Sequence, residues 1–255
     1  MAILIVVILF SFLVPVGLLL WWNGRKKTGL WPVLVGAVCF ILFALVLEPL
    51  LHQVCLAGKK NAVSAAITSS LVLYTLYGVF AAGIFEETGR FFGFRLLLKN
   101  RREAPVAIAY GIGHGGIEVI LVLGVTYVTY LLVKAGVPVG GGAAAMLRSA
   151  ADTVTLPLAC FAMLERISAL MLHAGLSMLV FRAAKEKGKF HYYPLAILLH
   201  AAADAPAVFY QIGVVPSIAA VETFSFVFGL ACLLLGFRIL KNYHEQPEDV
   251  SGCPE

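Results

Sequence analysis

Seven runs of apolar residues follow one another along the chain, and short polar stretches separate them. Each run is at least about 20 residues long, which is the length that a helix needs to cross roughly 30 Å of hydrocarbon. The runs cover residues 2–22, 29–51, 66–98, 104–134, 153–183, 191–211 and 217–240. This pattern predicts an all-α fold, a polytopic transmembrane helical bundle of about seven spans.

The segments between the runs predict how the bundle is organised. Three glycines at 140–142 follow Pro138 and predict a loop between the fourth and fifth helices, and Pro216 predicts the turn into the last helix. No linker rich in glycine, serine or proline divides the chain. We therefore expect a single transmembrane bundle over residues 1–243, with a motif core at about 66–211.

Lysine and arginine are distributed unevenly between the two sides that the spans define. One side carries thirteen of them and the other carries four, while Arg90 and Arg166 lie inside predicted spans. Because the cytoplasmic loops of membrane proteins carry the excess of Lys and Arg, we expect the N-terminus outside and the C-terminus inside. Residues 244–255 would then form a short polar cytoplasmic tail, and the expected location is the cell membrane.

Composition supports the membrane class and narrows the partners. Charged residues make up 13% of the chain, against about 25% in a soluble domain, and mean hydropathy is +0.93. The net charge of +5 comes from short loops between apolar runs, so we expect membrane lipids and no nucleic acid as partners. The five cysteines are scattered without a C-x-x-C pair, which argues against a disulfide framework and a thiolate metal site.

Ionisable residues inside the predicted spans point to a function. Each costs at least about 2.5–3.5 kcal/mol at the bilayer centre, so a chain keeps them where they are paired or line a wet cavity. Four consecutive spans, the third to the sixth, carry them. They are Glu86, Glu87 and Arg90; His114 and Glu118; Glu165, Arg166 and His173; and His200 and Asp204.

Spacing and depth predict that these residues meet in one site. Three pairs among them are four residues apart, so each pair lies on one face of its helix. At 1.5 Å per residue, the first glutamate and the three histidines lie about 14–20 Å from the cytoplasmic ends. Helix packing alone would need far fewer polar groups, which favours a functional site. Within it we expect Arg90 and Arg166 to be structural and salt-bridged to nearby carboxylates.

Two hydrolytic mechanisms suit this set of residues. In the first, Glu86, with Glu87 beside it, is a general base that activates water against a peptide carbonyl. His114 would assist it or protonate the leaving amine, while His200 and Asp204 position the substrate or stabilise the oxyanion.

The second mechanism uses a metal. His114, His173, His200 and Glu86 are the candidate ligands of a zinc ion that keeps one position open for water. The residue types alone leave both mechanisms open. Two other membrane-protease arrangements are missing from the sequence, namely an H-E-x-x-H motif and a pair of aspartates inside spans.

The same residues resemble the motifs of a known superfamily. Residues 86–90 (Glu-Glu-Thr-Gly-Arg) resemble the Glu-Glu-x(2–3)-Arg/Lys motif of the CPBP and PrsW superfamily of intramembrane proteases. Residues 110–114 (Tyr-Gly-Ile-Gly-His) resemble its aromatic-xxx-His motif, and residues 200–204 (His-Ala-Ala-Ala-Asp) resemble its final His-xxx-Asn/Asp motif. The fuller strings are most similar to the YhfC branch, and the resemblance covers residues 80–206, roughly half the chain.

The resemblance implies an intramembrane endopeptidase, of the glutamic or the metallo type, that cleaves membrane-embedded or lipidated peptides. Carried over, Glu86 and His114 would activate water, and His200 and Asp204 would stabilise the oxyanion. The supporting residues would be Arg90, Glu118, Glu165, Arg166 and His173.

Three positions depart from the CPBP pattern. Arg90 falls three residues after the second glutamate instead of four, Tyr110 replaces the usual Phe, and Asp204 stands where Asn is common. His173 and Glu165 have no CPBP counterpart and are more similar to the PrsW pattern. The additional histidine keeps the zinc mechanism open.

Two other functional classes fit some of the same features. Intramembrane His, Glu and Arg also form proton relays, so a proton- or metal-coupled transporter is one alternative. Such transporters usually contain inverted repeats and broken helices, and the sequence shows no repeat. A non-catalytic membrane immunity or scaffold protein is the other alternative, and the complete set of motifs weighs against it.

Overall fold

The computed structural model describes residues 1–58, 60–138 and 143–243, and every regular element among them is helical. The loop predicted at 140–142 and the tail predicted at 244–255 lie outside the described residues. The elements are α1 (Ala2–Lys26), α2 (Trp31–Phe40), η1 (Ile41–Leu47), α3 (Glu48–Cys55), α4 (Ala62–Ser69), α5 (Leu71–Phe92), η2 (Gly93–Leu97), α6 (Pro105–Glu118), η3 (Val119–Gly124), α7 (Val125–Lys134), α8 (Ala144–Asp152), α9 (Leu156–Lys185), α10 (Tyr192–Gln211) and α11 (Ile218–Lys241).

The predicted all-helical membrane bundle is confirmed. Six continuous helices of the described chain are long and apolar enough to cross a membrane. They are Ala2–Lys26, Trp31–Cys55, Leu71–Leu97, Pro105–Lys134, Leu156–Lys185 and Ile218–Lys241. The seventh predicted run forms α10, which is 20 residues long but less apolar because it carries His200 and Asp204. The number of spans is thus close to the predicted seven, and the direction in which they cross the membrane stays a prediction.

Local chemistry explains where the helices differ from the predicted runs. The third run divides at Ser70, whose backbone is extended and whose hydroxyl accepts a hydrogen bond from the Leu73 amide. Asn61 begins α4 with a capping box, in which its side chain accepts from the Ser64 amide. Three spans contain short π-helical segments, η1, η2 and η3, and such segments are frequent near functional sites.

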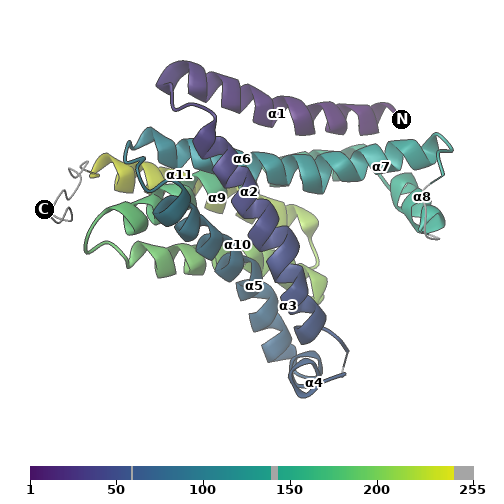
Figure 1. Ribbon diagram of the computed structural model, residues 1–255. Coiled ribbons are helices and arrows are strands. Elements are labelled where there is room, and N and C mark those ends of the chain that lie inside the picture. The colour runs from purple at the N-terminus through teal and green to yellow at the C-terminus, as the bar shows by residue number, and fades with distance from the viewer. Residues whose placement is uncertain (59, 139–142, 244–255) are drawn as a thin grey trace, which may run out of the picture.

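Helix α9 lies at the centre of the bundle. In its most apolar stretch of 18 residues 78% of the residues are buried, against 22–33% in the corresponding stretches of the other five spans. It packs against α6, α11, α10 and α5, while α2 covers the far side of α6 and α1 runs along α6 and α7 (Figure 1). The other three helices that carry ionisable residues, α5, α6 and α10, therefore all pack against α9.

Glycines allow the helices of the core to approach closely. A Cβ atom added at Gly113 would lie 2.0 Å from the Val33 carbonyl oxygen of α2, and one added at Gly175 would lie 2.4 Å from the Cys232 carbonyl oxygen of α11. Small residues at such crossings are typical of membrane helices, which pack mainly through van der Waals contact. These contacts set the positions of α6 and α9, and hence of His114 and His173.

Candidate active site

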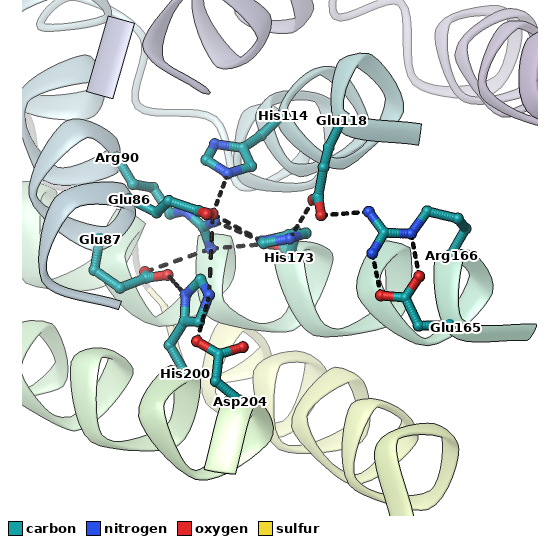
Figure 2. A network of polar contacts seen from close by, with 10 residues as sticks. All are labelled: Glu86, Glu87, Arg90, His114, Glu118, Glu165, Arg166, His173, His200 and Asp204. Carbon is teal, nitrogen blue, oxygen red and sulfur yellow. Dashed lines mark hydrogen bonds and ion pairs between the residues drawn. The ribbon is translucent and has the colours of Figure 1, made fainter. Parts of the chain in front are cut away.

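The structure brings all ten predicted residues into one network of polar contacts (Figure 2). They come from α5, α6, α9 and α10, the four helices whose polar groups the sequence placed at one depth. Seven of them are at least nine-tenths buried inside an otherwise apolar bundle: Glu86, Glu87, Arg90, His114, Arg166, His173 and His200. Such burial requires that each charged group has a partner or a polar cavity.

Glu86 is at the centre of the network. Its Oε2 atom lies 2.9 Å from His114 Nε2 and 3.8 Å from His173 Nδ1. His200 Nε2 approaches the same oxygen at 4.0 Å. One carboxylate oxygen thus faces three imidazole rings from three different helices.

Contacts on both sides of its ring hold His173. Arg90 Nη2 lies 3.0 Å from His173 Nδ1, and Arg90 Nη1 donates to the His173 carbonyl oxygen at 3.2 Å. A guanidinium can only donate, so Nδ1 accepts and the hydrogen of the neutral ring is on Nε2. That nitrogen lies 2.7 Å from Glu118 Oε2.

Glu87 connects the opposite side of the network to α10. Its Oε1 atom lies 2.8 Å from His200 Nδ1, and its Oε2 atom lies 3.4 Å from Arg90 Nη1. The other nitrogen of His200 lies 3.7 Å from Asp204 Oδ2. His200 therefore has a carboxylate near each of its ring nitrogens, and both nitrogens can act as donors.

Arg166 closes the network on α9. It donates to Glu118 Oε1 at 2.7 Å and also contacts both carboxylate oxygens of Glu165. Arg90 and Arg166 thus both lie against carboxylates, in agreement with the ion pairs that we expected for them.

A cavity of about 360 Å³ lies on one side of the network and has walls from α5, α6, α9, α10 and α11. Its polar lining consists mainly of Glu86, Glu118, Glu165, Arg166, His173, His200, Asp204 and Gln211. His114, Glu87 and Arg90 are fully buried behind this wall. His114 therefore does not line the cavity but contacts Glu86, which does. His173, His200 and Asp204 line the cavity directly.

Some polar residues near the site were not predicted. Glu48 on α3 is buried, and its Oε1 atom lies 3.3 Å from His52 Nε2. Glu222 on α11 is also buried. Both lie within predicted spans but near a span end. An acidic residue is less unusual there, so the sequence gave no reason to predict that these carboxylates are buried. Thr88 and Tyr193 join α5 to α10 through a 2.7 Å hydroxyl contact that the sequence gave no reason to expect.

The donor set of Glu86, His114 and His173 fits a catalytic zinc ion. One ligand atom from each lies within 4.8 Å of the others, and two imidazoles with one glutamate are the ligands of several zinc peptidases. Glu86 Oε2 lies 2.9 Å from His114 Nε2 and 3.8 Å from His173 Nδ1, so these three residues would hold the ion between them.

The surrounding contacts also bear on a metal. His114 Nδ1 has no hydrogen-bond partner among the described residues, so a metal bound at Nε2 in place of the Glu86 contact would leave the ring hydrogen on Nδ1 without an acceptor. Glu118 lies behind His173 in the manner of a carboxylate that orients a ligating histidine. Arg90 donates to Nδ1 of the same ring, and a metal bound at Nδ1 would have to displace this donor.

The fold and the site define a class: a multi-pass helical membrane protein with a buried histidine–carboxylate centre beside a polar cavity. Comparison with known proteins agrees with this class. Residues 10–225 match the family described as YhfC intramembrane metalloprotease. The chain is also 31% identical over 223 residues to a protein of Bacillus subtilis (strain 168) described as the uncharacterized membrane protein YhfC, and the match covers 83% of this chain and 85% of that relative. No solved structure matches the chain.

The chain therefore belongs to the YhfC intramembrane metalloprotease family. The resemblance that the motifs indicated is confirmed for this branch. The family description supports a membrane-embedded hydrolase in general terms and makes zinc a plausible ion for the Glu86, His114 and His173 cluster.

Proposed function

We propose that the chain is an endopeptidase of the cell membrane that hydrolyses membrane-embedded or membrane-tethered peptides with the help of zinc. The observation that carries this proposal is the position of Glu86 Oε2, which lies between His114 Nε2 and His173 Nδ1 in the wall of a polar cavity. Glu86, His114 and His173 would hold the ion. When bound, zinc activates water as a nucleophile and polarises a carbonyl oxygen.

His200 and Asp204, which also line the cavity, would act on the substrate. His200 has donors to offer, and its Nε2 atom lies within 4.0 Å of Glu86 Oε2, so it is placed to donate to the oxygen of the attacked carbonyl. The Asp204 side chain lines the cavity and is 32% exposed, which leaves its carboxylate able to accept a proton from water. Asp204 would then pass that proton to the leaving amine nitrogen as the peptide C–N bond breaks.

Glu87, Arg90 and Glu118 would position these groups. Glu87 contacts His200 Nδ1 at 2.8 Å, Glu118 contacts His173 Nε2 at 2.7 Å, and Arg90 donates to the His173 carbonyl oxygen at 3.2 Å. A metal held by His173 Nδ1 would replace the contact of that nitrogen with Arg90. Substrates would be peptides within or attached to the membrane, because apolar helices surround the cavity and exclude it from bulk water over most of its wall.

The proposal is tested by the metal content and peptidase activity of the purified full-length protein. We expect Glu86→Gln and His114→Ala protein to lose bound zinc and cleavage of a panel of membrane peptides. The matched control is Glu103→Gln, because Glu103 is an exposed glutamate in the α5–α6 connection that pairs with Arg101 on the surface.

Three results would contradict different parts of the proposal. Full activity in metal-free wild-type protein would refute the role of zinc but keep the peptidase. Unchanged cleavage by Glu86→Gln protein would refute the site itself. Saturable flux in proteoliposomes without any proteolysis would instead indicate the transporter.

A further inference from the structure

The cavity extends away from the polar network in one direction. Along α5 its wall runs from Glu86 back to Gly78, and along α10 it runs from His200 forward to Gln211. The two helices are antiparallel, since Gly78 faces Val208 and Gly83 faces the backbone near His200. Both walls therefore lead to the same end of the bundle, where α5 begins and α10 ends.

On the opposite side of the network the bundle is closed. Phe94, Tyr110 and Phe181 are all fully buried there. The ring of Phe94 packs at 4.5 Å from that of Tyr110 and at 5.3 Å from that of Phe181, measured between centroids. Close packing of this kind leaves no room for water.

A second cavity enlarges the open end. It has a volume of about 160 Å³ and contains the polar side chains of Glu48, His52 and Tyr77. It shares Gly78, Val208 and Gln211 with the cavity beside the network, so the two are adjacent. His52 Nδ1 lies 2.5 Å from the Tyr77 hydroxyl. A polar, roomy space of this kind can hold water.

The two ends of the bundle also differ in charge. At the closed end, Arg95 donates to the Ala184 carbonyl and Lys185 donates to the Leu98 carbonyl, and both residues lie in an arginine- and lysine-rich region. At the open end, the connections 56–61 and 212–217 contain only two basic residues in the sequence, Lys59 and Lys60. In Figure 1, α4 at the open end lies at the bottom, far from the C-terminal end of α11 at the left, which carries Arg238 and Lys241. Since the basic end of a membrane protein faces the cytoplasm, the open end faces outward.

We propose that the active-site cavity opens to the non-cytoplasmic face of the membrane and is closed toward the cytoplasm. Water enters through the cavity of Glu48, His52 and Tyr77. The substrates are membrane-attached peptides whose scissile bond is presented from the non-cytoplasmic side. The statement about substrates rests on the proposed peptidase function, whereas the side from which the cavity opens does not.

Cysteine accessibility tests the proposal without requiring activity. Ala207 lines the cavity one turn beyond Asp204 and is exposed, so Ala207→Cys places a small thiol in its wall. All cysteine variants are made in a protein in which serine replaces Cys160 and Cys253. The other three cysteines are buried and are kept. Intact cells and permeabilised cells are treated with a membrane-impermeant maleimide. Lys60→Cys marks the open end and Lys187→Cys marks the closed end.

We expect Ala207→Cys and Lys60→Cys to be labelled in intact cells, and Lys187→Cys only after permeabilisation. Labelling of Ala207→Cys only after permeabilisation, together with Lys187→Cys, would overturn the proposal. The proposal would also be overturned if neither Ala207→Cys nor Gln211→Cys were labelled in intact or in permeabilised cells. Gln211 lines both cavities, so its variant tests the mouth of the same space. Loss of peptidase activity in other variants would leave these outcomes unaffected.

Discussion

Replacing Arg90 by methionine tests whether this buried cation holds the site together. Arg90 is fully buried, and it lies 3.4 Å from the equally buried carboxylate of Glu87. It also donates to the carbonyl oxygen and ring of His173. Methionine fills much of the same volume but leaves His200 as the only close polar partner of Glu87 among the described residues.

The expected loss of stability follows from this burial. Removing one partner of a buried ion pair typically costs about 3–5 kcal/mol, because the other charge remains without compensation. For a chain of this size about 1 kcal/mol corresponds to 2–4 °C, so the unfolding midpoint should fall by about 6–20 °C. Adding Glu87→Gln removes the uncompensated charge and should recover about 1–3 kcal/mol.

Thermal unfolding of the purified protein in one detergent, at one scan rate, measures these shifts. Arg101→Met is the matched control, because Arg101 pairs with Glu103 at 3.0 Å on the surface, where the side chains are 29% and 50% exposed. Such exposed pairs contribute about 0–1 kcal/mol. If Arg90→Met unfolded at the same temperature as Arg101→Met, the structural role of Arg90 would be refuted.

Three further predictions concern packing, metal and proton transfer. Gly113→Ala should destabilise the protein by about 1–3 kcal/mol, since the new Cβ would lie 2.0 Å from the Val33 carbonyl oxygen; an unchanged unfolding midpoint would contradict this. His173→Ala should lower zinc content in elemental analysis, whereas His191→Ala, outside the network, should keep it; equal zinc in both would exclude His173 as a ligand. Asp204→Asn should keep zinc but cleave peptides about 10²–10⁴-fold more slowly, and wild-type rates would remove Asp204 from proton transfer.

The helices and the composition of the site could be predicted from the sequence because both depend on local properties. Apolar runs of 20 residues or more identify spans wherever they occur, and a charge inside such a run is conspicuous. Spacing of four residues, as between His114 and Glu118, assigns two side chains to one helix face without knowledge of the neighbouring helices. Counting from span ends then indicated that four helices present polar groups at one depth.

The breaks within the runs were harder to predict. Ser70 interrupts the third run and the π-helical segments occur inside apolar stretches, where hydropathy changes little. Helix α8 lies between spans and is too short and too polar to resemble one. Glu48 and Glu222 lie near span ends, so their burial became evident only when α3 and α11 were packed against neighbouring helices.

The sequence by itself determined that this is an all-helical membrane protein with a histidine–carboxylate site on four successive spans. Only the tertiary structure decided which atoms meet: that Arg90 and Glu118 hold opposite sides of the His173 ring, and that His114 lies behind Glu86. It also decided toward which end the cavity opens. The physical reason is that hydropathy and helical spacing act within one helix, whereas these contacts depend on how closely helices cross, and glycines such as Gly113 set those crossings against residues far away in the chain.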